Sequence, residues 1–179
     1  MPDFFFVFDS EAERLTRLNA KKSVNCIISG SPKHEAYRYQ LKRWCEVDPL
    51  KCEAQKSLVF IGQPSEVGGV VENFSVFVNA LADIDAPLKL FFKPHPSNAD
   101  HLHLYQEHML AQGHPFEIIS GPVDVESVMF FADVVVTCFS TSGFDYNYLQ
   151  LYSERTLGEL VYLITGEDIL ASIEEVVGE

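Results

Sequence analysis

The sequence predicts an α/β fold of the Rossmann-like kind, in which a parallel β-sheet carries helices on both faces. Short apolar runs at residues 57–64, 88–92 and 133–139 alternate along the chain with segments of helical period. Strands that are apolar throughout are typical of parallel sheets buried on both sides. Helices that alternate with such strands form right-handed crossovers between them, so the order of the elements also favours this fold.

Residues 1–34 are predicted to form a separate β-α-β segment. The run FFFVF at residues 4–8 predicts a buried strand, Ser10 and Glu13 stand in capping-box spacing ahead of a helix, and residues 24–30 predict a second strand. These strands must join the edge of the main sheet or pair with another subunit, because a bare apolar edge invites association. We therefore expect a homo-oligomer or a partner domain.

Residues 35–56 predict a linker helix with a connection, and residues 57–179 form the main domain. Its first helix carries an apolar face, formed by Val70, Phe74, Phe77, Val78 and Leu81. A strand at 88–92 precedes a helix at 98–113, which ends at Gly113 and turns Leu102, Tyr105 and Met109 inward.

The second half of the main domain continues the alternation. A strand at 116–120 precedes a short helix capped by Asp124, and a strand at 133–139 follows. The next helix is predicted to bury a face formed by Phe144, Tyr148, Leu151 and Tyr152. A strand at 160–164 and a closing helix at 167–179 complete the domain.

Composition excludes some classes of function. The formal net charge is −13, from 26 acidic and 13 basic residues, which argues against binding to nucleic acid or to an anionic membrane surface. The apolar run near the N-terminus is too short for a membrane span or a signal peptide, so we expect a cytoplasmic protein. The four cysteines show no CxxC spacing and are expected to be reduced, with a Cys45–Cys52 bridge as the alternative.

Two loops at predicted strand ends carry the candidate site. Lys93 and His95 belong to the sequence KPHP, whose two prolines stiffen the backbone around the histidine. Ser140, Thr141 and Ser142 lie between a strand and a helix, where hydroxyl groups and free backbone N–H groups bind anions. Because ligands of such folds bind beyond the carboxyl ends of the strands, both loops are expected to meet at one phosphate.

Structural roles are the alternatives for the same residues. His95 can cap neighbouring carbonyl groups in a rigid turn, and the Ser-Thr-Ser turn can serve only as a helix N-cap. The residues His101, His103, Glu107 and His108 suggest a metal site at first sight. On a helix, however, no single face presents three of them, so a solvated helix is the prediction.

These motifs resemble a known group of enzymes. LFFKPHP at residues 90–96, followed by ADVVVTCFSTSGFDYNYL at 132–149, is similar to the donor-binding half of GT-B-type bacterial envelope transferases. The similarity is to the capsule-polysaccharide and sialyltransferase-like families and to the CDP-glycerol glycerophosphotransferases. IISGSPKHEAY at 27–37 resembles the end of their acceptor half, and the resemblance covers residues 24–150.

The resemblance implies a glycosyltransferase or glycerophosphotransferase of cell-envelope polysaccharide synthesis. Its donor would be a sugar or polyol linked to CMP, CDP or UDP, bound as substrate without a further cofactor or metal. Lys93, His95 and the Ser140–Ser142 turn would hold the donor phosphates, His95 would act in catalysis, and Asp145 matches the aspartate of the family's FD pattern.

The resemblance also leaves alternatives open. These families carry a whole acceptor domain, which usually supplies the catalytic base, ahead of the turn at residues 29–32, whereas here a short segment precedes it. The turn that usually supports the nucleotide after the FD helix is absent as well. A non-catalytic nucleotide-sugar binding module and a structural or assembly protein that retains the fold therefore stand beside the enzyme.

Overall fold

The computed structural model describes residues 4–20, 23–51, 55–64, 70–111, 116–138 and 140–164. The chain divides into two compact units, residues 1–40 and residues 41–179. This division falls inside the segment 35–56 that the sequence assigns to a linker helix. Two helices occupy that segment and the residues before it, namely α2 (Pro32–Glu35) and α3 (Tyr37–Cys45).

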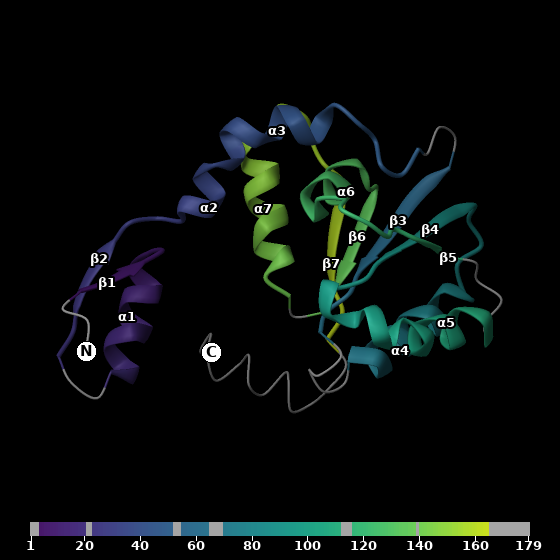
Figure 1. Ribbon diagram of the computed structural model, residues 1–179, viewed down its shortest axis with the longest axis horizontal. Helices are drawn as coiled ribbons and strands as arrows, with labels where there is room; N and C mark the ends of the chain where they lie inside the picture. The colour runs from purple at the N-terminus through teal and green to yellow at the C-terminus, as the bar shows by residue number, and fades with distance from the viewer. Residues whose placement is uncertain are drawn as a thin grey trace. The chain divides into compact units, whose positions relative to one another are not determined.

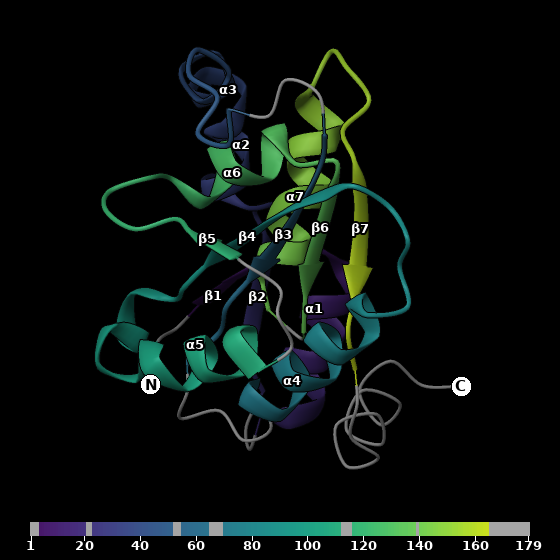
Figure 2. The same ribbon diagram turned by 90° about the vertical axis from the view of Figure 1, so that its right-hand side faces the viewer.

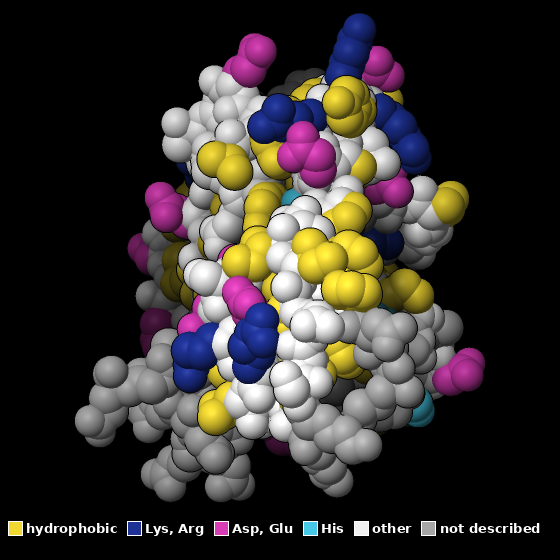
Figure 3. Space-filling view, turned by 90° about the vertical axis from the view of Figure 1, so that its left-hand side faces the viewer, with side chains coloured by type: hydrophobic (Ala, Val, Ile, Leu, Met, Phe, Trp, Pro, Cys, Tyr) yellow, Lys and Arg dark blue, Asp and Glu magenta, His cyan; other side chains and the backbone are white. Residues whose placement is uncertain are grey.

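The first unit contains a small parallel sheet. β1 (Phe4–Val7) and β2 (Asn25–Ile28) pair with each other and are joined by α1 (Ser10–Asn19). They do not join the larger sheet. The prediction of a buried first strand is wrong, because Phe4 and Phe6 are 54% and 71% exposed. A single helix covers only one face of a two-stranded sheet, so alternate residues of β1 stay exposed. Hydrophobic side chains, drawn in yellow, are exposed on the face of the molecule that Figure 3 shows.

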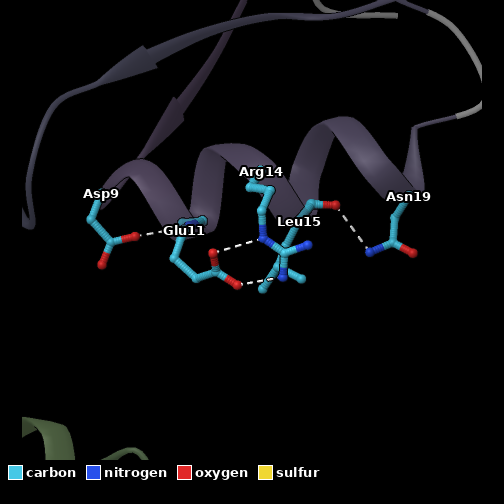
Figure 4. Close-up of polar contacts among 6 residues, drawn as sticks. Asp9, Glu11, Arg14, Leu15 and Asn19 are labelled. Atoms are coloured by element: carbon cyan, nitrogen blue, oxygen red, sulfur yellow. Dashed lines mark hydrogen bonds and ion pairs between the residues drawn. The ribbon is translucent and has the colours of Figure 1, made fainter. Parts of the chain in front are cut away.

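The start of α1 differs from the predicted capping box by one residue. The N-cap is Asp9 and not Ser10, and Figure 4 shows the carboxylate of Asp9 bonded to the first turn of the helix. It accepts the backbone N–H of Ala12 at 2.8 Å, which satisfies one of the free donors of the first turn. Glu13 forms an ion pair with Arg17 at 2.7 Å.

The second unit is built on a five-stranded sheet, and its strand order is β5-β4-β3-β6-β7 with every pairing parallel. The strands are β3 (Lys56–Ile61), β4 (Leu88–Lys93), β5 (Phe116–Ile118), β6 (Val134–Thr137) and β7 (Glu159–Tyr162). This confirms the predicted Rossmann-like α/β fold. The order reverses between β3 and β6, and in such sheets ligands bind at this point, beyond the carboxyl ends of the strands.

Helices cover both faces of the five-stranded sheet (Figures 1 and 2). They are α4 (Val70–Leu81), the 3₁₀ helix η1 (Pro96–His101), α5 (Leu102–Ala111), α6 (Val125–Phe131) and α7 (Ser142–Tyr152). α4 and α5 lie on one face, and α6 and α7 lie on the other.

Aromatic rings fill the core between the sheet and α4 and α5. Phe60 of β3 and Phe92 of β4 lie side by side in register and pack against Phe74 of α4 and Tyr105 of α5. The predicted face of α4 is confirmed at its four buried residues, Phe74, Phe77, Val78 and Leu81. The side chain of Val70 lies outside the described part of the structure.

The predicted apolar face of α7 is wrong. Phe144 and Leu151 are 63% and 70% exposed, whereas Tyr146 and Leu149 are buried. The hydroxyl of Tyr146 donates to the backbone carbonyl of Gly158. This bond and the burial of Leu149 set the rotation of the helix, because a buried tyrosine needs a partner for its hydroxyl.

A polar contact joins the amino ends of β3 and β6. The carboxylate of Asp133 accepts from the ammonium of Lys56 at 2.6 Å, from the backbone N–H of Ser57 at 2.9 Å and from the Ser57 hydroxyl at 3.0 Å. Burial opposes ionisation of this carboxyl, but the hydrogen bonds from Lys56 and Ser57 prevail and lower its pKa.

This contact predicts a dependence of stability on acid. The carboxyl contributes stability that is present above its unfolded pKa of about 3.9, and this contribution is lost as the pH falls through the lower pKa of the folded state. We expect Asp133→Asn to reduce the free energy of unfolding at pH 7 and to flatten its decline below pH 4, measured by urea unfolding. Asp83→Asn, at an exposed turn, is the control; equal curves for both variants would contradict the assignment.

Some expectations fall on residues that the structure does not describe. These are the helix end at Gly113, the closing helix at 167–179 and Cys52. Cys45 and Cys138 are free thiols, and burial raises the pKa of Cys138 to about 11. None of the helices in the described part of the chain is both long and apolar enough to cross a membrane.

Candidate functional site

A cleft of about 520 Å³ opens at the carboxyl ends of β3, β4 and β6 in the second unit. Three loops and the end of β3 line it, namely residues 93–96, 121–126 and 140–142 together with Ile61 and Gly62. The structure therefore brings together five of the six candidate residues: Lys93, His95, Ser140, Thr141 and Ser142. The position of the cleft agrees with the point at which the strand order reverses.

Gly62 lets the KPHP loop pass close to the end of β3. Its backbone N–H donates to the carbonyl of Lys93 at 2.9 Å. A Cβ atom at this position would lie 3.2 Å from the backbone nitrogen of His95 and 3.3 Å from the carbonyl oxygen of Lys93. The absence of a side chain here therefore sets how closely the histidine approaches the adjacent strand.

His95 is held with one ring nitrogen turned inward to its own loop. The residue caps η1, and its Nδ1 accepts the backbone N–H of Ser97 at 3.2 Å and lies 2.8 Å from the Ser97 hydroxyl. A backbone N–H can only donate, so Nδ1 is the acceptor and the neutral ring carries its proton on Nε2. His95 therefore has a structural role as the cap of η1, although it caps a backbone N–H and not the carbonyl groups that the structural alternative predicts, and it also lines the cleft.

Lys93 ends β4 and supplies a cationic side chain to the cleft. Burial lowers the pKa of its ammonium group, and the negative charge of Asp124 partly offsets this effect. No described residue forms a hydrogen bond or an ion pair with this ammonium. A half-buried ammonium group without such a partner is a favourable position for an anion, because a negative charge at short range stabilises the charged form that burial disfavours.

The Ser-Thr-Ser turn precedes α7, as the sequence predicts, but part of its donor set is already used. The Ser140 hydroxyl oxygen accepts the backbone N–H of Ser142 at 3.1 Å, and the Ser140 carbonyl accepts that of Gly143 at 3.1 Å. Thr141 is exposed, and its side chain makes no capping hydrogen bond. The turn therefore caps the start of α7 through the Ser140 hydroxyl, while Thr141 lines the cleft and leaves its side chain out of the cap.

Asp145 is the candidate that the structure places elsewhere. It lies in the first turn of α7, is only 5% exposed and does not line the cleft. Its carboxylate is therefore positioned to interact with the helix amino end and not with a group bound in the cleft.

The loop at residues 121–126 is the part of the cleft that sequence reasoning missed. Asp124 was predicted to cap α6, but its side chain makes no capping bond. Its carboxylate instead accepts from the guanidinium of Arg43 at 2.8 Å and from the indole of Trp44 at 3.2 Å, both near the end of α3. The signal available in the sequence was Gly121-Pro122 directly after a strand, and Gly121 has a φ of +85°, a conformation that favours glycine.

Two of the described acidic residues line the cleft. Asp124 forms an ion pair with Arg43 at 2.8 Å, and Glu126 lies at the start of α6. In the part of the chain that is described, no three His, Cys, Asp or Glu side chains are grouped so that they could hold a metal ion. The cleft thus combines hydrogen-bond donors and one lysine with two carboxylate groups.

The sequence matches no protein-family model and no curated protein.

Proposed function

We propose that this chain binds a nucleotide-activated sugar or polyol by its phosphates, as the donor-binding part of a GT-B-type glycosyltransferase or glycerophosphotransferase of cell-envelope polysaccharide synthesis. The observation that carries the proposal is the meeting of Lys93, His95 and Thr141 at one cleft, where the strand order of a parallel sheet reverses. Donor groups of three kinds around one anion are suited to a phosphate.

The same groups fit the chemistry of transfer. In such a reaction the hydroxyl of an acceptor attacks the activated carbon or phosphorus and gives its proton to a base, which the acceptor domain usually supplies in these families. The nucleotide phosphate leaves with the electron pair of the broken bond. Negative charge grows on the leaving oxygen, where the ammonium of Lys93 and the Nε2–H of His95 can stabilise it. Glu126 also lines the cleft, and a carboxylate there would accept hydrogen bonds from hydroxyl groups of the donor.

Titration of the purified chain with CMP, CDP, UMP, UDP and GDP tests the proposal. We expect selective binding of one base, and His95→Ala should weaken it about tenfold, as for one hydrogen bond to a charged group worth roughly 1.5 kcal/mol. His103→Ala, which changes an exposed histidine of α5, should leave the affinity unchanged. The absence of binding to all five nucleotides would refute the donor site and favour a structural or assembly role.

A binding module without turnover is the second candidate. It is favoured by the state of Asp124, whose carboxylate is already bonded to Arg43 and Trp44 and so is poorly placed to act as a base. Release of free nucleotide from the corresponding nucleotide-sugar, measured with and without added acceptor, separates the two candidates. Binding without release supports the module, and acceptor-dependent release supports the transferase.

A further inference from the structure

Asp124 stands at the N-cap position of α6, but its side chain does not cap this helix. An aspartate at an N-cap ordinarily accepts a backbone N–H of the first helical turn, whereas the Asp124 carboxylate makes no such bond. Its Oδ2 atom instead accepts from the guanidinium of Arg43 at 2.8 Å and from the indole N–H of Trp44 at 3.2 Å. The carboxylate therefore bonds to α3 and not to its own helix.

The end of α3 is fastened to α6 beside this contact. Trp44 is buried, and its backbone carbonyl accepts the hydroxyl of Ser127, a buried residue of α6, at 3.1 Å. Two bonds from α3 to Asp124 and one bond from Ser127 back to α3 thus join the two helices. Because the indole is fixed by burial, the position of the Asp124 carboxylate is set by α3.

Asp124 also belongs to the cleft, where its charge acts on Lys93. Both residues line the cleft. Burial lowers the pKa of Lys93, and the negative charge of Asp124 partly offsets this effect. The carboxylate nevertheless bonds to Arg43 and Trp44, and no described residue forms a hydrogen bond or an ion pair with the Lys93 ammonium. A nearby carboxylate and a bound anion compete for the same cation, since each stabilises its charged form.

We propose that Arg43 keeps the anion site open, because it neutralises the Asp124 carboxylate and holds it away from pairing with Lys93. The inference rests on the proposed function and adds Arg43 to it as a positioning residue. Arg43 is not among the described residues that line the cleft, so it acts through Asp124. Without the guanidinium, the carboxylate keeps its full negative charge beside the site, where it repels a phosphate and attracts the ammonium that should bind it.

Replacing Arg43 by glutamine tests this role without endangering the fold. The ion pair is exposed, with 73% of the Arg43 side chain and 41% of the Asp124 side chain accessible. Exposed ion pairs add little to stability, so the urea midpoint should stay close to that of the unchanged chain. With inorganic pyrophosphate as the probe in calorimetric titrations, Arg43→Gln should bind about threefold more weakly, which is the range of a partly screened charge pair.

Lys42→Gln is the matched control for charge. Lys42 precedes Arg43 in α3 and is exposed, and its replacement changes the net charge by the same amount. At an ionic strength of about 0.15 M, exposed charges more than roughly 8 Å apart are largely screened, so the affinity of Lys42→Gln should be unchanged. An equal loss in both variants would assign the effect to the charge of the whole molecule and overturn the inference.

A double substitution separates control of the Asp124 charge from simple support of the loop. Asp124→Asn removes the charge and should bind pyrophosphate at least as tightly as the unchanged chain. In this background Arg43→Gln should cause no further loss, so the double variant should bind as Asp124→Asn does. A weaker affinity of Asp124→Asn would show that the contact only holds the loop, and an equal effect of Arg43→Gln in both backgrounds would show that it does not act through Asp124; either result would overturn the inference.

The same titrations distinguish this inference from the proposed function. If the unchanged chain binds pyrophosphate and Arg43→Gln binds it equally well, only the role of Arg43 is refuted. If the unchanged chain binds neither pyrophosphate nor any of the five nucleotides, the anion site itself is refuted, and the role of Arg43 with it.

Discussion

Replacing Lys93 by methionine is expected to weaken the binding of the preferred nucleoside diphosphate about thirtyfold, which corresponds to the loss of charge-assisted hydrogen bonds worth roughly 2 kcal/mol. Among the described residues that line the cleft, Lys93 is the one lysine or arginine. The net charge of −13 repels anions from the molecule as a whole, so this local cation is needed to hold a diphosphate. Titration calorimetry at fixed ionic strength measures the change.

The stability of the Lys93→Met variant tests whether its weaker nucleotide binding comes from the loss of a binding group or from damage to the fold. Burial lowers the pKa of Lys93 in the folded chain, so the charged form is less favourable there than in the unfolded chain, and at neutral pH the charge opposes folding. Removal of the ammonium should therefore leave the free energy of unfolding at pH 7 unchanged or higher. A variant that loses both affinity and stability would indicate a structural lysine.

Lys89→Met is the matched control for charge. Lys89 lies on the same strand and the same face as Lys93, four residues nearer to its amino end, and it forms an ion pair with Glu117. Both substitutions change the net charge equally, but only Lys93 lines the cleft. Equal losses of affinity in the two variants would show that long-range charge, and not the cleft, governs binding.

The strands of the second unit and two of the three loops of the cleft could be predicted from the sequence. β3, β4 and β6 are continuous apolar runs without a period of their own, and their short length and flanking turn residues distinguish them from helices. The KPHP loop and the Ser-Thr-Ser turn follow these strands directly. Because the strands are parallel, their carboxyl ends lie at the same edge of the sheet, and the two loops meet there at the cleft.

The parts that could not be predicted depend on contacts between distant segments. In α7, the stripe of Phe144, Tyr148 and Leu151 is as regular as that of Tyr146 and Leu149, and only the bond from Tyr146 to Gly158 and the packing of Leu149 decide between them. The role of Asp124 required knowledge of Arg43 and Trp44, some eighty residues earlier in the chain.

The order of the strands in the sheet could not be predicted from the sequence either. That the KPHP loop and the Ser-Thr-Ser turn share one cleft depends on β4 and β6 both lying beside β3. Similarly, the apolar residues of β1 predict burial, and the exposure of Phe4 and Phe6 follows from a sheet of only two strands with one helix.

Replacing Phe74 by alanine is expected to produce the largest loss of stability, about 3–5 kcal/mol, as for the removal of a buried phenylalanine. The ring has no exposed surface. Its centroid lies 4.9 Å from that of Phe60, 5.2 Å from that of Phe92 and 5.2 Å from that of Tyr105. The loss should appear in urea as a lower midpoint with an unchanged slope.

A control substitution and a binding measurement test whether the aromatic core around Phe74 also affects the cleft. Val76→Ala alters a partly exposed residue of the same helix, and it should change stability by no more than about 0.5 kcal/mol. Phe74 packs on the face of the sheet opposite to that of Lys93, because Phe92 and Lys93 are consecutive in β4 and point to opposite faces. Phe74→Ala should therefore keep its nucleotide affinity under conditions where it is folded. A loss of affinity in folded Phe74→Ala would mean that the aromatic core, by holding β3 and β4 in register, also sets the geometry of the cleft.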